Sequence, residues 1–140
     1  MRRTDVFAPI LIALILGGCA DDPAEVAKPT PAVVDTVAGS DRKQVTLTDD
    51  AVKRISLKTG SVSAGSGAET VVPYGAVIYD AEGLAWAYVS KGGNAYVREP
   101  LDIARIEGNR AYLRSGPAVG IKVAVVGVAE LYGAETGIGK

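Results

Sequence analysis

The sequence predicts an all-β fold, a small antiparallel β-barrel or sandwich with one short helix, after a signal peptide and a disordered linker. In the second half of the chain, short apolar segments separated by turn sequences recur about every 8–12 residues, which is typical of such folds. The composition agrees, because 17 glycines and few aromatic residues suit short strands and many turns. With 140 residues, the chain has room for one folded domain. We expect the signal peptide over residues 1–18, the linker segment over 19–43 and the β domain over 44–140.

The amino terminus has the layout of a secretion signal. Arg2 and Arg3 precede an apolar run over residues 6–16, and small residues follow it. The run is about half the ~20 apolar residues that a membrane-spanning helix needs, so we do not expect it to remain as an anchor. The adjacent arginines also raise the twin-arginine export route. The residues that follow them match that signal poorly, and the export route stays open.

The segment Leu16-Gly17-Gly18-Cys19 resembles the lipobox of bacterial lipoproteins. The resemblance implies cleavage before Cys19 and a lipid on its thiol, which attaches the mature chain to a membrane facing the periplasm or the cell exterior. Multiple acyl chains make such attachment durable. By the sorting rule of Gram-negative lipoproteins, Ala20 after the cysteine implies the outer membrane. The alternative is a plain secretory signal before a free thiol.

Residues 19–43 are expected to form a flexible tether after the lipidated cysteine. Pro23, Pro29 and Pro31 interrupt the segment, and its apolar residues follow no sustained period of 2 or 3.6. A helix lying on the membrane is the competing interpretation, but the prolines disfavour it.

The expected β domain begins with a strand and a short helix. Val45 and Leu47 alternate with polar residues, which predicts a half-buried strand. Thr48 is a suitable N-cap for a helix whose apolar residues Val52 and Ile55 lie three apart on one face. An extended segment over residues 57–62 and a flexible break over 64–68 follow.

Seven further strands are expected, with short turns between them. The alternation is clearest over residues 84–90, where both faces are apolar, so this strand is predicted to be central in its sheet. The four later arginines are expected on a solvated face, although they could meet an acidic partner; they are Arg98, Arg105, Arg110 and Arg114. The expected strands cover residues 70–72, 76–79, 84–90, 96–98, 101–106, 111–114 and 121–128.

The residue types disfavour catalysis. The chain has no histidine and one cysteine, which excludes a Ser-His-Asp triad, a Cys/His metal site and an internal disulfide. The nearest carboxylate pair outside the helix start, Asp80 and Glu82, lies in a predicted turn, where capping explains it. The net charge of −1 gives no attraction for nucleic acid. We therefore expect no enzyme activity, no cofactor and no metal.

Two stretches, residues 45–62 and 72–135, resemble the membrane-proximal β domain of the periplasmic adaptor subunits, or membrane fusion proteins, of resistance-nodulation-division (RND) efflux pumps. The second match runs from Val72-Pro73-Tyr74-Gly75-Ala76-Val77-Ile78-Tyr79-Asp80 to Glu130-Leu131-Tyr132-Gly133-Ala134-Glu135. It implies a partner-binding role for Tyr132 and Glu135. Full adaptors carry a lipoyl-like domain and a helical hairpin between the two regions, and here only residues 63–70 lie between the first segment and the strand that opens the second.

The resemblance implies a noncatalytic accessory that binds or steadies an RND-type or related membrane transporter. The alternative is a freestanding ligand-binding or envelope-structural lipoprotein with the same β fold, because fold alone does not separate the two.

Overall fold

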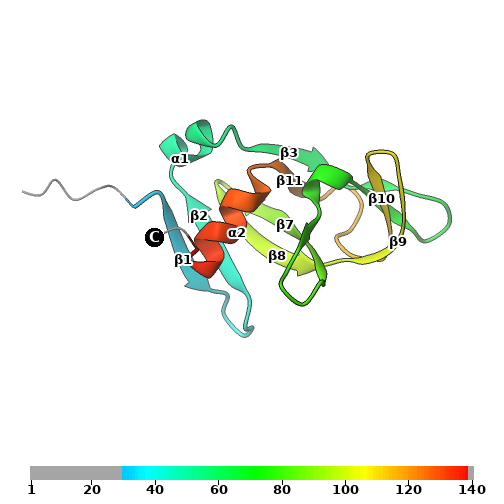
Figure 1. Cartoon of the computed structure of the whole chain (residues 1–140), viewed down its shortest axis with the longest axis horizontal. Coiled ribbons are helices and arrows are strands. Elements are labelled where there is room, and N and C mark those ends of the chain that lie inside the picture. Colours follow the sequence, from blue (N-terminus) through cyan, green and yellow to red (C-terminus); the bar gives the residue numbers. More distant parts are fainter. Residues whose placement is uncertain (1–29, 139–140) are drawn as a thin grey trace, which may run out of the picture.

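A computed structural model describes residues 30–138, in which antiparallel strands form two sheets (Figure 1). The larger sheet, sheet A, has the strand order β1 (Ala32–Thr36), β2 (Lys43–Leu47), β8 (Ala95–Pro100), β7 (Ala85–Gly92), β11 (Lys122–Val126) and β3 (Lys58–Ser61), and β6 (Ile78–Tyr79) pairs with β7. The smaller sheet, sheet B, has the order β4 (Ser63–Ala64), β5 (Thr70–Pro73), β10 (Arg110–Ser115) and β9 (Asp102–Glu107). The all-β prediction is confirmed. The sheets do not close into a barrel, and their arrangement is sandwich-like.

Sheet A is the middle layer between sheet B and the helices. Alternate side chains of β7 point to its two faces: Ala87 and Val89 join the core shared with sheet B, and Tyr88 joins the core under the helices. Ala87 and Tyr88 are both fully buried. The strand predicted to be central therefore is central, between β8 and β11.

The predicted helix is α1 (Asp49–Arg54), and its two ends follow known capping rules. The Thr48 hydroxyl accepts a hydrogen bond from the Ala51 backbone N–H at 3.2 Å, as an N-cap does. At the other end, Ser56 has a φ of 51°, and the N–H of Leu57 donates to the Val52 carbonyl at 3.0 Å. This is a Schellman-type ending with serine at the position that glycine usually fills.

A second helix, α2 (Val128–Thr136), lies on sheet A on the side opposite sheet B and was not predicted. The sequence predicted a strand over 121–128, whereas β11 ends at Val126 and Gly127, with a φ of 85°, turns the chain into the helix. Leu131 is fully buried against the sheet. Figure 1 shows α2 in front of the strands of sheet A, with β9 and β10 at the far end of the molecule from β1.

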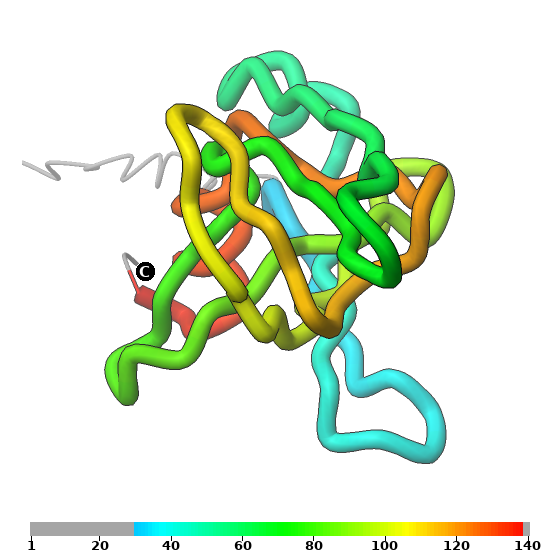
Figure 2. The backbone as a smooth tube through the Cα atoms, turned by 90° about the vertical axis from the view of Figure 1, so that its right-hand side faces the viewer, coloured from blue at the N-terminus to red at the C-terminus, as the bar shows by residue number. Residues whose placement is uncertain are grey.

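The structure contradicts the prediction of a linker over 19–43 for its last part. Residues Ala32 to Thr36 form β1, which pairs with β2 in register from Ala32 opposite Leu47 to Thr36 opposite Lys43. The physical reason is that Pro31 precedes the strand, where it removes no ladder hydrogen bond, and its carbonyl accepts a bond from Thr48 N–H at 3.0 Å. Figure 2 shows the hairpin that joins β1 and β2 projecting from the body of the domain. The rest of the predicted tether, residues 19–29, lies outside the described residues.

Two smaller expectations also differ from the structure. The segment expected as a strand over 76–79 begins in a 3-10 turn, η1 (Tyr74–Ala76), and only Ile78–Tyr79 pair as a strand. The expected break over 64–68 overlaps the two-residue strand β4. The other strands lie within a few residues of their predicted positions.

Candidate functional site

The residues predicted to carry function fall into two groups. The first group, the predicted lipobox and lipidation site, lies outside the described residues; its members are Leu16, Gly17, Gly18 and Cys19. Tyr132 and Glu135 both lie on α2, where Tyr132 is half-buried and only 7% of Glu135 is exposed.

Glu135 is held by two side chains of sheet A, and we call Tyr88, Arg98 and Glu135 the α2 clamp. The Tyr88 hydroxyl donates a hydrogen bond to one carboxylate oxygen, Oε2. Arg98 Nη2 lies 3.2 Å from the other oxygen, Oε1. Burial, and then the hydrogen bond to the Glu135 carboxylate, raise the pKa of Tyr88, so its hydroxyl keeps its proton far above neutral pH.

Arg98 contacts two aromatic rings and is also paired with Glu135. Its guanidinium carbon lies 4.4 Å from the centroid of the Trp86 ring and 5.6 Å from that of Tyr132. Such cation–π contacts stabilise a guanidinium that has left bulk water, and 23% of the Arg98 side chain remains exposed. The prediction that Arg98 lies on a solvated face is therefore wrong, whereas Arg114, which is 60% exposed, does lie on one.

Tyr132 and Glu135 thus serve to attach α2 to sheet A. Both carboxylate oxygens of Glu135 already have partners within the chain. Tyr132 contributes its ring to the Arg98 stack. Direct contact of these two residues with another protein stays a prediction, and the geometry points to a positioning role instead.

The carboxylate of Asp80 organises the turn before β7. It accepts hydrogen bonds from the backbone N–H groups of Glu82 and Leu84 and from the Trp86 indole, the last at 2.7 Å. Desolvation opposes a lower pKa for Asp80, but these hydrogen bonds outweigh it and lower the pKa. Of the carboxylate pair considered in the sequence, Asp80 therefore has a structural task in the turn, and Glu82 contributes its backbone N–H to it.

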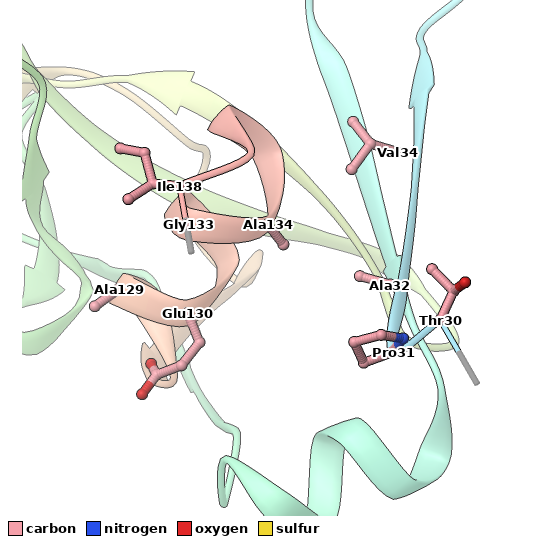
Figure 3. Close-up of a pocket in the computed structure, with 9 residues that line it drawn as sticks. All are labelled: Thr30, Pro31, Ala32, Val34, Ala129, Glu130, Gly133, Ala134 and Ile138. Atoms are coloured by element: carbon pink, nitrogen blue, oxygen red, sulfur yellow. The ribbon is translucent and has the colours of Figure 1, made fainter. Parts of the chain in front are cut away.

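An apolar groove with a volume of about 770 Å³ lies between β1 and α2 (Figure 3). In Figure 3, Ala32 and Val34 point from β1 toward α2, and Ala134 points from α2 toward β1. A smaller hollow of about 280 Å³, which shares Val34 and Ala134, continues it toward Thr36. The lining of the larger groove is Thr30, Pro31, Ala32, Val34, Ala129, Glu130, Gly133, Ala134 and Ile138.

The groove exists because the side chains that border it are small. Val128, Leu131 and Glu135 of α2 face the sheet, which leaves Ala129 and Gly133 to border the groove. A Cβ added to Gly133 would meet only the Ile138 carbonyl oxygen, at 3.4 Å. Glu130 is the one charged side chain in the lining, and it makes no ion pair with any of the described residues.

Within residues 30–138, no group of three metal-ligating side chains comes together. No helix in the same range is long and apolar enough to cross a membrane. Comparisons of the chain with protein-family models, with curated proteins and with solved structures found no match.

Neither the groove nor its two walls was predicted from the sequence, although one signal for α2 was present. The available signal was Gly127 followed by nine residues with apolar Val128 and Leu131 three apart, which fits a short helix better than the end of a strand.

Proposed function

We propose that the protein is a lipid-anchored, noncatalytic accessory of a membrane transporter in the cell envelope, and that the transporter docks in the groove between β1 and α2. The observation that carries the proposal is the groove itself, an apolar concave surface on a small domain. Exposed apolar concavities of this kind are typical of binding sites.

The position of the groove along the chain supports the proposal. Thr30 and Pro31, where the described chain begins, are part of its lining. Ten residues lie between Cys19 and Thr30, and the eleven Cα–Cα steps from one to the other span at most about 40 Å. A lipid on Cys19 would therefore hold the groove within reach of the membrane surface and of proteins embedded there.

The resemblance of residues 72–135 to adaptor subunits supports the choice of partner, because the matching segment includes α2 up to Glu135, all but its last residue. The α2 clamp gives this helix a fixed place on sheet A, so one wall of the groove is rigid before a partner arrives. Preorganisation of this kind lowers the entropic cost of binding.

Site-specific photo-crosslinking in host membranes tests the proposal. A photoreactive amino acid at Ala134, within the groove, should give adducts that contain a transporter subunit. The same amino acid at Val119, which is exposed and outside the groove lining, is the matched control and should not. Repeated recovery of no transporter subunit from Ala134 would contradict the proposal.

The groove also supports the alternative of a freestanding ligand-binding lipoprotein, since concave apolar sites bind small molecules as well. The crosslinking experiment distinguishes the two functions, because they predict different adducts at Ala134. A ligand-binding protein would give adducts of low mass at Ala134, and these would form in the absence of any transporter.

A further inference from the structure

The groove lining has an aliphatic character that suits a hydrocarbon chain. Its apolar side chains are those of proline, alanine, valine and isoleucine, and no aromatic ring from residues 30–138 lines it. A methylene chain needs neither an aromatic ring nor a charged group in the surface that binds it, because it gains free energy from removal of its apolar surface from water alone.

The protein's own predicted acyl chains lie within reach of this groove. The span from Cys19 to Thr30, up to about 40 Å, exceeds the length of either wall: the five residues of β1 extend about 17 Å and the nine residues of α2 about 14 Å. Since Thr30 lies at the groove, Cys19 can return to any point along it.

We infer that an acyl chain attached to Cys19 occupies the groove between β1 and α2 while the protein is away from a membrane, and leaves it when the protein becomes anchored. The inference rests on the lipid anchor of the proposed function. A bilayer surrounds a whole acyl chain, whereas an open groove covers only part of it, so the membrane is the stronger competitor. In the absence of a membrane, the groove is a better environment for the acyl chain than water is.

This exchange would couple docking to anchoring. An acyl chain in the groove covers Ala32, Val34 and Ala134, the surface proposed to receive the transporter. The surface would become free only after the acyl chain enters the bilayer. The protein would therefore dock with a transporter in the membrane and not before.

The single cysteine makes a direct test possible, because a maleimide reacts with one site of the mature chain, residues 19–140. One sample carries hexadecyl maleimide on Cys19 and the matched control carries N-ethylmaleimide, which has the same linkage without the long chain. In buffer, the amide and methyl NMR signals of Ala32, Val34 and Ala134 should differ between the two conjugates. Addition of phosphatidylcholine vesicles should remove the difference.

Two further variants test whether the NMR difference between the conjugates arises from binding in the groove. Gly133→Leu places a side chain in the groove and should abolish the difference between the conjugates, whereas Val119→Leu, outside the lining, should retain it. A nitroxide at the end of the alkyl chain should broaden the Ala134 signals of the unsubstituted chain, which gives a measurement that does not depend on how a variant folds.

Identical groove signals for the two conjugates in buffer, with no broadening by the nitroxide, would overturn the inference. A difference that persists after vesicles are added would overturn the release step. The NMR result is independent of the crosslinking experiment, because it involves no transporter. Failure to crosslink a transporter would contradict the proposed function, but it would not contradict an acyl chain detected in the groove by NMR.

Discussion

Replacement of Glu135 by alanine tests the α2 clamp most directly. In the folded protein the variant leaves the Tyr88 hydroxyl, in a fully buried side chain, without its acceptor, and leaves Arg98 without its carboxylate partner. A hydrogen bond to a charged group contributes about 1.5–3 kcal/mol, and an unsatisfied buried hydroxyl costs about 1–3 kcal/mol. Arg98 adds less, about 1 kcal/mol, because it remains partly exposed and stacked on Trp86.

We therefore expect Glu135→Ala to lower the free energy of unfolding by about 3–5 kcal/mol, a large part of the total for a domain of this size. Urea unfolding of the mature chain can be followed by the fluorescence of Trp86, the single tryptophan, which lies beside the clamp. Tyr88→Phe is the control and should cost less, since it leaves the Arg98 pair intact. A loss below about 1 kcal/mol for Glu135→Ala, or an equal loss for both variants, would refute the reasoning.

Four other outcomes are expected. Ser56→Gly should raise the free energy of unfolding by about 0.5–1 kcal/mol, because residue 56 has a φ of 51° that glycine adopts without strain; no change in the urea midpoint would contradict this. Gly133→Ala should stabilise by a similar amount, about 0.5–1 kcal/mol, since alanine is the better helix former and its Cβ has room; a lower midpoint would show that the groove wall is tighter than described. The folded state raises the pKa of Tyr88 above its ordinary 10.0, so above pH 10 the unfolded chain loses this proton while the folded chain keeps it, and stability falls. The slope from this group is up to about 1.4 kcal/mol per pH unit, and Tyr88→Phe should remove it from unfolding curves measured between about pH 8 and 11. Finally, Cys19→Ser should leave the domain folded but move it from the membrane to the soluble fraction after cell fractionation; retention on membranes would assign the anchoring to another contact.

The parts of the fold that follow from local pattern could be predicted from the sequence. The helix α1 has a cap, acidic residues in its first turn and an apolar face, and all these signals lie within a few residues of each other. The central strand β7 is apolar on both faces, which only a strand covered on both sides requires. Such signals do not depend on which segments become neighbours in space.

The walls of the groove depend on partners distant in the sequence. The strand β1 is short and follows prolines, and its extended form is stabilised by pairing with β2 and by the bond from Thr48 N–H to Pro31. The helix α2 has nine residues, too few for a stable helix in isolation, and contacts with β7 and β8 through Glu135 hold it. In the local sequence, the prolines argue against a strand at β1 and the short length argues against a helix at α2. The local sequence contains no information on the long-range contacts that stabilise both elements.

The groove is not a requirement of folding, and this distinguishes it from the clamp. Glu135 and Leu131 attach α2 to sheet A from one side of the helix, while Ala129 and Gly133 on the other side leave apolar volume unfilled. Larger apolar side chains at these two positions would bury more apolar surface, and replacement of Gly133 by a good helix former would also favour the helix, so the small residues come at a cost in stability. Residues that lower the stability of the folded domain in this way are typical of binding sites. If Gly133→Ala stabilises the domain while Gly133→Leu removes the effect of the acyl chain on Ala134, the empty space serves binding and the clamp serves to hold it open.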